Sequence, residues 1–429
     1  MAFFDRSSLN DGVRAREVFG WAMYDFANSG YTTVVLTAVF SAYFVGGVAG
    51  GAPWATFAWT AALSLSCLLV MVAAPAVGAW ADAHGAKKRV LAVATLGCVT
   101  ATAALAWVGP GDIALAVVAI IVSNFFYSLA EGVVAAFLPE LARPHALGTV
   151  SGWGWSFGYF GGMLTLGLGL AVVLSAQARG QGAAQFVPLT MAITAVVYAL
   201  ACLPTFLLLR ERSAHRSAGS TMPAEDSLQR LRRTWRESAR FADFRRMLWC
   251  GCLYQAGIAV VIALAAVYAE QAMRFTQLQT MLLIFLVNIA AALGAFGFGY
   301  AQDRLGHRRA LVLTLLGWIL MVAMAALGTS VALFWVAAAI AGLCMGSSQS
   351  CGRAMVAAMA PAQRTAEFFG LWTLAVRLAA IIGPLTYGAV TWATGGNHRL
   401  AIGVTGLFFV AALGVLRGID LDRARQAAA

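Results

Sequence analysis

Twelve long apolar runs leave this chain of 429 residues few ways to fold. A helix crosses the hydrocarbon core of a bilayer with about 20 apolar residues. Hydrophobic residues make up 61% of the chain and charged residues 11%, whereas a soluble domain carries roughly 25% charged residues. We therefore predict an all-α integral membrane protein with twelve transmembrane helices. They lie near 18–44, 56–80, 89–108, 112–138, 147–175, 187–209, 246–270, 277–301, 309–328, 331–356, 366–393 and 400–418.

A short charged phrase occurs twice between apolar runs. Residues 78–88 and 299–309 both read Gly-x-x-x-Asp-x-x-Gly-x-basic-basic, and Asp82 and Asp303 are 221 residues apart. Other matches between the two halves follow at nearly the same offset, such as Pro139 with Pro361. The repeat predicts two pseudo-symmetric six-helix bundles. A parallel repeat of this kind is typical of one class of membrane transporter, in which the substrate site lies between the halves near the midplane.

The basic residues predict the orientation of the chain. Arg179, Arg274 and Arg399 fall in loops on one side of the predicted membrane, Arg353 and Arg377 lie in or at the edge of helices, and the other Lys and Arg residues lie on the opposite side. By the positive-inside rule, both termini are cytoplasmic. This placement explains the net charge of +11 without a nucleic-acid partner. The first 17 residues are polar and unlike a cleavable signal, so we expect helix 1 to stay in a bacterial inner membrane.

A long polar stretch divides the apolar sequence. The predicted organisation is a cytoplasmic N-terminus (1–17), an N-terminal six-helix bundle (18–209), a basic cytoplasmic linker (210–245), a C-terminal six-helix bundle (246–418) and a cytoplasmic C-terminus (419–429). Within the linker, Leu228, Leu231 and Trp235 recur at helical spacing among basic residues. They indicate an amphipathic helix lying on the anionic inner leaflet, with a disordered linker as the alternative.

Several segments carry a resemblance to a known family. The doubled phrase resembles the loops between helices 2 and 3 and between helices 8 and 9 of the major facilitator superfamily. The Trp-Ala-Met-Tyr-Asp-Phe-Ala-Asn-Ser-Gly-Tyr segment at 21–31 looks like the helix-1 signature of the bacterial unknown-major-facilitator family, which is related to the autophagy-linked vacuolar amino-acid effluxers. Segments 137–142, 158–162, 367–370 and 383–384 add to the likeness, which covers the whole chain.

The chain departs from that family pattern at two places. Members usually carry Tyr-Asn-Ala where this chain has Val-Ala-Ala at 134–136, and an Asp-Gly pair where this chain has Ala256 and Gly257. Whatever those polar groups contact in relatives is missing here. The substrate and the coupling ion are therefore not carried over from the resemblance.

Two intramembrane carboxylates are the candidates for proton coupling. A charge at the bilayer centre costs about 2.5–3.5 kcal/mol on insertion scales, so a retained one calls for a functional hypothesis. Trp21, Asp25 and Asn28 share one face of helix 1, and Glu131 ends a polar stripe with Asn124 and Ser128 on helix 4. The alternatives are a structural Asp25, hydrogen-bonded to a neighbouring helix or ion-paired at the cytoplasmic gate, and a structural pair of Glu131 with an arginine.

Arg377 is the deepest cation, and its counterpart in the first half is Trp155. A guanidinium can fork onto a carboxylate, which suits an anionic or zwitterionic substrate. The alternative is a structural pair with Glu131 or Asp25. The full set of substrate-binding candidates is Asn28, Asn124, Trp155, Tyr254, Gln255, Gln349 and Arg377.

The doubled phrase predicts a conformational latch. Its aspartate can accept hydrogen bonds from a helix N-terminus, where free N–H groups favour an anion, and Lys87 and Lys88 are expected to anchor the next helix at the inner leaflet. Such a contact forms in one access state and breaks in the other. The residues assigned to the gate or latch are Asp82, Lys87, Lys88, Asp303, Arg308, Arg309, Arg353 and Glu367.

The sequence predicts no enzyme, cofactor or metal site. It contains no phosphate-binding Walker phrase, all five histidines lie in predicted loops or the linker, and no metal-ligand cluster can be assembled. The favoured function is a monomeric secondary active transporter, a symporter or antiporter, that moves a small organic solute by alternating access. The resemblance implies amino-acid or related carboxylate efflux, and protons and membrane lipids are the other expected partners. The alternatives are a transporter or flippase of lipid-like or amphipathic compounds, and a receptor or assembly protein on a transporter scaffold.

Overall fold

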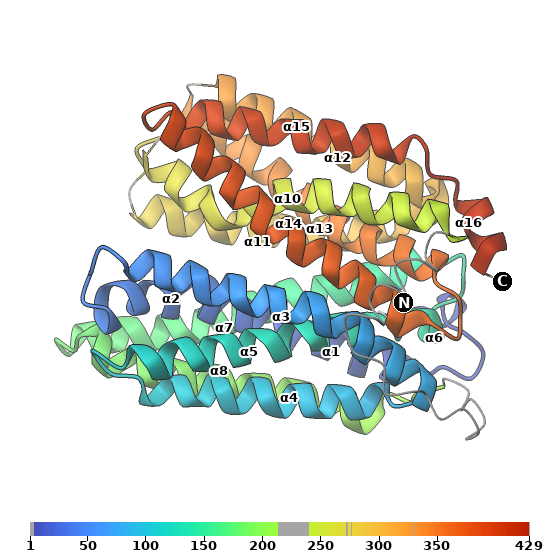
Figure 1. Ribbon diagram of the computed structural model, residues 1–429, viewed down its shortest axis with the longest axis horizontal. Coiled ribbons are helices and arrows are strands. Elements are labelled where there is room, and N and C mark those ends of the chain that lie inside the picture. The colour runs from blue at the N-terminus through green and yellow to red at the C-terminus, as the bar shows by residue number, and fades with distance from the viewer. Residues whose placement is uncertain (1–3, 213–239, 272, 276, 329, 429) are drawn as a thin grey trace.

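The computed structural model describes residues 4–428 except 213–239, 272, 276 and 329. Its long elements are helices, arranged side by side in two bundles (Figure 1). The N-bundle consists of α1 (Ala15–Tyr31), α2 (Phe40–Tyr43), α3 (Ala55–His84), α4 (Lys87–Ala104), α5 (Ile113–Ala135), α6 (Leu138–Leu141), α7 (Leu147–Ala178) and α8 (Ala183–Leu208). The C-bundle consists of α10 (Ala242–Gln271), α11 (Gln277–Leu305), α12 (His307–Leu327), α13 (Val331–Met359), α14 (Thr365–Ala393) and α15 (His398–Leu416), and is followed by α16 (Leu421–Ala428).

The long helices match the predicted spans. Eleven helical segments of the described chain are long and apolar enough to cross a membrane, and α10 forms over the remaining predicted span, 246–270. The first span differs from the prediction of one helix over 18–44. It runs from Ala15 to Val48, and its second half contains two π-helical segments, Thr32–Ala38 and Phe44–Val48. The apolar pattern sets the length of a span, but it does not reveal a local change from α to π winding.

Both chain ends lie at the same end of the molecule (Figure 1), which we call the termini end. The linker also leaves and re-enters the described chain there. Glu211 accepts hydrogen bonds from the backbone N–H groups of Lys87 and Lys88, at 2.7 and 3.2 Å, and so caps the start of α4. The amphipathic helix predicted around Leu228, Leu231 and Trp235 lies outside the described residues.

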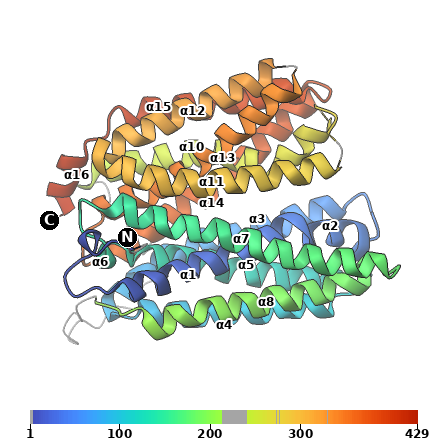
Figure 2. The ribbon, with the colours of Figure 1, turned by 180° about the vertical axis from the view of Figure 1, so that it is seen from behind.

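Two helix crossings hold the bundles together near the termini end. Helix α3 crosses α14, and α7 runs along α11 (Figure 2). Glycines make both crossings close: a methyl group on Gly78 would overlap the carbonyl oxygen of Ala366, and one on Gly152 would overlap that of Ala295. The crossings are pseudo-equivalent, because each joins the second or fifth long helix of one bundle to its counterpart in the other. This close approach places the polar side chains of the two bundles against each other.

Candidate functional site

Asp25 and Arg353 form a buried ion pair between the bundles. Asp25 lies on α1 and Arg353 on α13, and Arg353 donates through Nη1 to Oδ2 at 2.5 Å and through Nη2 to Oδ1 at 2.9 Å. Each side chain is only 5% exposed. A bidentate fork of this kind fixes both the distance and the orientation of the two helices. The pair therefore links the N-bundle to the C-bundle on the termini side of the interface.

Two tryptophans of the N-bundle enclose the same arginine. The guanidinium carbon of Arg353 lies 5.3 Å from the ring centroid of Trp21 and 4.8 Å from that of Trp155. Trp21 is held in place because its Nε1 donates to the carbonyl oxygen of Val134 at 2.8 Å. Contact with an aromatic face stabilises a desolvated cation further. Asp25, Trp21 and Trp155 thus surround a charge that the C-bundle supplies.

A second carboxylate–arginine pair connects α5 with α14. Arg377 donates through Nη2 to Oε2 of Glu131, and its guanidinium carbon lies 5.6 Å from the ring centroid of Tyr127. This pair is less enclosed than the first, since the Glu131 side chain is 27% exposed and that of Arg377 is 12% exposed. In both pairs the N-bundle supplies the acid and the aromatic ring, and the C-bundle supplies the arginine.

The two pairs are related by the internal repeat with their charges exchanged. Glu131 and Arg353 occupy equivalent positions 222 residues apart, and so do Trp155 and Arg377. One half of the repeat therefore carries an acid where the other carries a base. Because the equivalent residues face each other's partners across the interface, the exchange creates two attractive pairs in place of two repulsive ones.

Several polar atoms near the pairs are buried without a hydrogen-bond partner among the described residues. They include Nε of Arg377, Nε1 of Trp155 and the hydroxyl of Tyr254. Gln255 is engaged, because its Nε2 donates to Oε1 of Gln349 at 2.8 Å, which joins α10 to α13 inside the C-bundle. A buried polar group without a partner costs about 1–3 kcal/mol. The unpartnered atoms are all able to donate, so they favour a ligand rich in acceptors.

Two of the substrate-binding candidates lie inside the N-bundle instead. The amide oxygen of Asn28 accepts a hydrogen bond from the Tyr198 hydroxyl at 2.8 Å, and Nδ2 of Asn124 donates to the Ser66 hydroxyl at 3.1 Å. Both asparagines are almost fully buried. Of the predicted polar stripe on α5, Asn124 is thus bonded within its own bundle, whereas Glu131 reaches the other one.

The aspartates of the doubled phrase contact helix N-termini across the interface. Oδ2 of Asp82 accepts from the backbone N–H of Glu367 on α14 at 2.9 Å. Asp303 accepts from the backbone N–H groups of Gly148 and Thr149 on α7 at 2.9 and 2.6 Å. Each aspartate sits where the helix dipole and free N–H groups stabilise an anion. The two contacts are pseudo-equivalent, and both close the termini end.

The basic residues of the first phrase do not anchor a helix at the lipid surface, and that expectation is wrong. Lys87 is 1% exposed, and its Nζ lies 2.8 Å from Oε1 of Glu140, 2.7 Å from Oγ1 of Thr365 and 3.5 Å from Oδ1 of Asp82. Lys88 donates to carbonyl oxygens at the end of α8. The charge of Lys87 is directed inward because three oxygen partners converge there.

The remaining residues assigned to the latch have separate positions. Glu367 pairs through its side chain with Arg364, at 2.7 Å, on the first turn of α14. Arg308 donates to the carbonyl oxygen of Arg417 at 2.9 Å, and Arg309 is exposed. Arg308 and Arg309 therefore lie at the surface of the C-bundle, away from the two aspartate contacts.

Sequence reasoning missed the aromatic partners of the two arginines and the acid that holds Lys87. Trp21 and Tyr127 each lie four residues before the acid they accompany, Asp25 and Glu131, and this spacing was the available signal, because residues four apart share a helix face. Glu140 follows a proline in α6 and belongs to no periodic pattern. Its role depends on the approach of α4 and α14.

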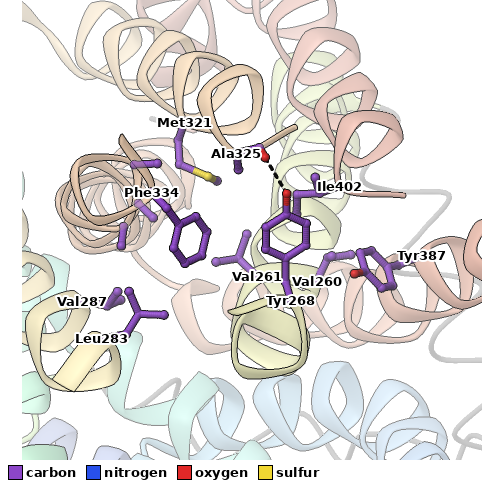
Figure 3. A pocket seen from close by; sticks show the side chains of 13 residues that line it. Val260, Val261, Tyr268, Leu283, Val287, Met321, Ala325, Phe334, Tyr387 and Ile402 are labelled. Atoms are coloured by element: carbon purple, nitrogen blue, oxygen red, sulfur yellow. Dashed lines mark hydrogen bonds between the residues drawn. The ribbon is translucent and has the colours of Figure 1, made fainter. Parts of the chain in front are cut away.

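A separate apolar cavity lies inside the C-bundle (Figure 3). Val261, Met321 and Phe334 are among the residues that line it. The hydroxyl of Tyr268 is turned to the carbonyl oxygen of Ala325, at 2.5 Å. The cavity thus presents hydrocarbon and no free charge, so it is unsuited to a polar solute. Among the described residues, no group of three or more His, Cys, Asp or Glu side chains is placed to hold a metal ion.

Comparisons with known proteins place the chain in a family. Residues 55–429 match the family described as "Vacuole effluxer Atg22 like". An uncharacterized MFS-type transporter of Bacillus subtilis (strain 168), YxiO, is 24% identical over 400 residues, which covers 91% of this chain and 92% of that protein.

Solved structures agree on the fold. A bacterial homologue of the iron transporter ferroportin in an outward-facing state has a TM-score of 0.71 at 16% identity, covering 94% of this chain and 99% of that one. The proton:xylose symporter XylE has a TM-score of 0.70 at 12% identity, covering 94% of each chain. The human organic anion transporter MFSD10 has a TM-score of 0.68 at 16% identity, covering 94% of this chain and 99% of that one. The predicted twelve-helix major facilitator fold is confirmed, and the chain belongs to the Atg22-like vacuole effluxer family.

Proposed function

We propose that this protein is a secondary active transporter that exports a small carboxylate, most suitably an amino acid, by alternating access between its two bundles. The description of its family names an effluxer, its Bacillus relative is described as an MFS-type transporter, and MFSD10 transports organic anions. The excess of basic residues on the termini side supports cytoplasmic termini in a bacterial inner membrane. The closed termini end is then the cytoplasmic end.

The observation that carries the substrate class is the set of unpartnered donors beside the two arginines. Arg377 has a free Nε although its Nη2 is bonded to Glu131, and Trp155 has a free Nε1. A carboxylate has about four lone-pair sites and no donors when ionised, so it matches donor groups of this kind. Arg377 would bind the substrate carboxylate once its pair with Glu131 loosens.

Proton coupling follows from what happens when the bundles separate. Opening the termini end withdraws Arg353 from Asp25 and Arg377 from Glu131. Leaving one member of a buried ion pair without its partner costs about 3–5 kcal/mol. A proton on each carboxylate would remove that penalty, so protonation would favour opening. Asp25 and Glu131 are therefore the proposed proton carriers.

The replacement Asp25→Asn tests this coupling. We expect uptake driven by a pH gradient into proteoliposomes to fall to background, while ligand binding in a thermal-shift assay stays measurable. Asp112→Asn, which changes an exposed loop acid outside the interface, serves as the matched control and should keep full flux. Concentrative uptake by Asp25→Asn equal to that of the unaltered protein would remove Asp25 from the mechanism.

The replacement Arg377→Ala tests the substrate class. Hydrogen bonds to a charged group contribute about 1.5–3 kcal/mol, so the affinity for a carboxylate ligand should fall by roughly 10- to 100-fold. Titration calorimetry with the best hit of an amino-acid and carboxylate screen measures this. Arg399→Ala is the control, because Arg399 bonds the carbonyl oxygen of Gly328 within the C-bundle. Equal affinities of both variants would contradict a carboxylate site at Arg377.

A further inference from the structure

Arg353 occupies a site built entirely by the other bundle. Its guanidinium is held by the carboxylate of Asp25 at 2.5 and 2.9 Å and lies against the rings of Trp21 and Trp155 at 5.3 and 4.8 Å. All three partners belong to the N-bundle, on α1 and α7. We call these three residues the N-bundle cage. In this state of the protein its occupant is a side chain of the C-bundle.

The cage is preformed, since its walls are fixed within one bundle. A methyl group on Gly154 would lie 2.6 Å from Oδ2 of Asp25 and 2.7 Å from the ring of Trp21, so this glycine lets α7 pack closely beside α1. The indole of Trp21 is bonded to the carbonyl oxygen of Val134 on α5. None of these contacts involves the C-bundle. Separation of the bundles would therefore remove Arg353 and leave the carboxylate and the two aromatic faces in place.

The vacated cage has the chemistry of a site for organic cations. A carboxylate can accept a guanidinium through two parallel hydrogen bonds, and tryptophan is the strongest of the aromatic side chains for binding a cation at its face. A proton on Asp25 would neutralise the acid, but it would leave both indole faces without the group that they enclose in the closed state. A flat or compact organic cation satisfies the acid and the rings together.

We propose that the N-bundle cage binds the cationic head of the transported solute, a guanidinium or alkylammonium group, when the bundles separate at the termini end. The solute then takes the position of Arg353 on Asp25, Trp21 and Trp155. This inference rests on the proposed alternating access. It adds a second recognition element to the carboxylate subsite at Arg377, so that a cation in the N-bundle and an anion at the C-bundle together define a zwitterionic or basic solute.

The first test empties the cage with Arg353→Ala and refills it with ethylguanidinium. Ethylurea, which is neutral and nearly isosteric, is the control probe. We expect ethylguanidinium to raise the thermal unfolding midpoint of Arg353→Ala in a saturable manner, and ethylurea to have no such effect. The added change Asp25→Asn should abolish the response. The added change Trp155→Leu should raise the half-saturating concentration by about 2- to 30-fold, the equivalent of a cation–π contact.

The second test keeps Arg353 and weakens closure instead, in case Arg353→Ala does not fold. The double variant Asp82→Ala/Asp303→Ala removes the acceptors of both latch contacts and should expose the cage more often. Ethylguanidinium should bind this variant more tightly than it binds the unaltered protein. Gly167→Ala, a change on α7 with open space around it, should bind as the unaltered protein does.

The outcomes separate this inference from the proposed function. Equal responses to ethylguanidinium and ethylurea, or no saturable response in either variant, would overturn the cage as a cation site even if carboxylate flux is measured in proteoliposomes. A saturable, Asp25-dependent response to ethylguanidinium supports the cage even if no carboxylate is transported, in which case only the proposed substrate class fails.

Discussion

Two arginines of the C-bundle each meet an acid and an aromatic ring of the N-bundle, but the two sites differ in enclosure. Arg353 is 4% exposed and lies between two indoles, whereas the Glu131 partner of Arg377 is 27% exposed. A buried ion pair often adds little net stability, although breaking it is costly. We therefore interpret the pair of Asp25 with Arg353 as the closed gate, and the pair of Glu131 with Arg377 as the one that a solute can displace.

A single methyl group tests how tightly the gate is packed. Gly154→Ala would place its Cβ 2.6 Å from Oδ2 of Asp25, so the carboxylate must move and the fork to Arg353 weakens. We expect a lower thermal unfolding midpoint and faster labelling of a cysteine introduced at the termini end. Gly167→Ala on the same helix meets nothing within 4 Å and should be neutral or slightly stabilising, because alanine favours a helix over glycine. Identical behaviour of the two variants would contradict close packing at the gate.

At the scale of elements, the last helix is fastened to the first turn of α10. Asp243 accepts from Nε and Nη2 of Arg423 on α16, both at 2.6 Å, and from the backbone N–H of Asp420 at 3.1 Å. Asp243 precedes the predicted span 246–270. The Arg423 hydrogen bonds are the main cause that lowers the pKa of the Asp243 carboxyl, with the Asp420 N–H and Arg246 acting in the same direction.

The lowered pKa of Asp243 predicts how docking of α16 depends on pH. A carboxyl whose pKa is depressed by its partners stabilises the docked form above its ordinary pKa of about 3.9, and this stabilisation is lost as the pH falls through the lowered value. Docking should therefore be constant from pH 8 to about pH 5 and weaken below about pH 4. The mobility of a spin label on Gln426→Cys measures this.

A matched pair of variants separates this contact from general acid effects. Asp243→Asn should release α16 at neutral pH, because the charged partner of Arg423 is lost. Asp422→Asn should not, since Asp422 is exposed and pairs only with Arg425 within the same short helix, and exposed pairs contribute little. A mobile label in Asp422→Asn at neutral pH would count against Asp243 as the fastening residue.

At the scale of the whole molecule, the internal repeat supplies two equivalent latches. Asp82 contacts the start of α14 and Asp303 the start of α7, on opposite sides of the interface. Sites that share no partners usually contribute additively. Asp82→Ala and Asp303→Ala should each destabilise the closed state by about 1–3 kcal/mol, and the double variant by the sum.

The population open at the termini end, measured by labelling of a cysteine introduced in that half of the interface, tests additivity. Arg309→Ala is the control, because Arg309 belongs to the second phrase but lies at the surface. A double variant no more open than either single variant would mean that one latch holds the closed state alone.

Much of the fold could be predicted because it depends on local properties. Span lengths follow from runs of apolar residues, and the two bundles follow from an offset that is visible in the chain. The site was only partly predictable. Asp25, Glu131, Arg353 and Arg377 stand out as charges in apolar sequence, but their pairing depends on how two bundles are packed. Lys87 looked like a lipid anchor because no local pattern reveals that Glu140 and Thr365 converge on it.

The sequence by itself determined that this protein is a duplicated twelve-helix membrane protein, since hydrophobic length and internal repetition are properties of the chain alone. Only the tertiary structure decided which charges meet. Asp25 and Arg353 are 328 residues apart, and their contact exists because glycines at the helix crossings bring the bundles close enough. The physical reason is that burying charges requires partners on both bundles at once, and the relative position of the bundles is set by packing rather than by any local sequence pattern.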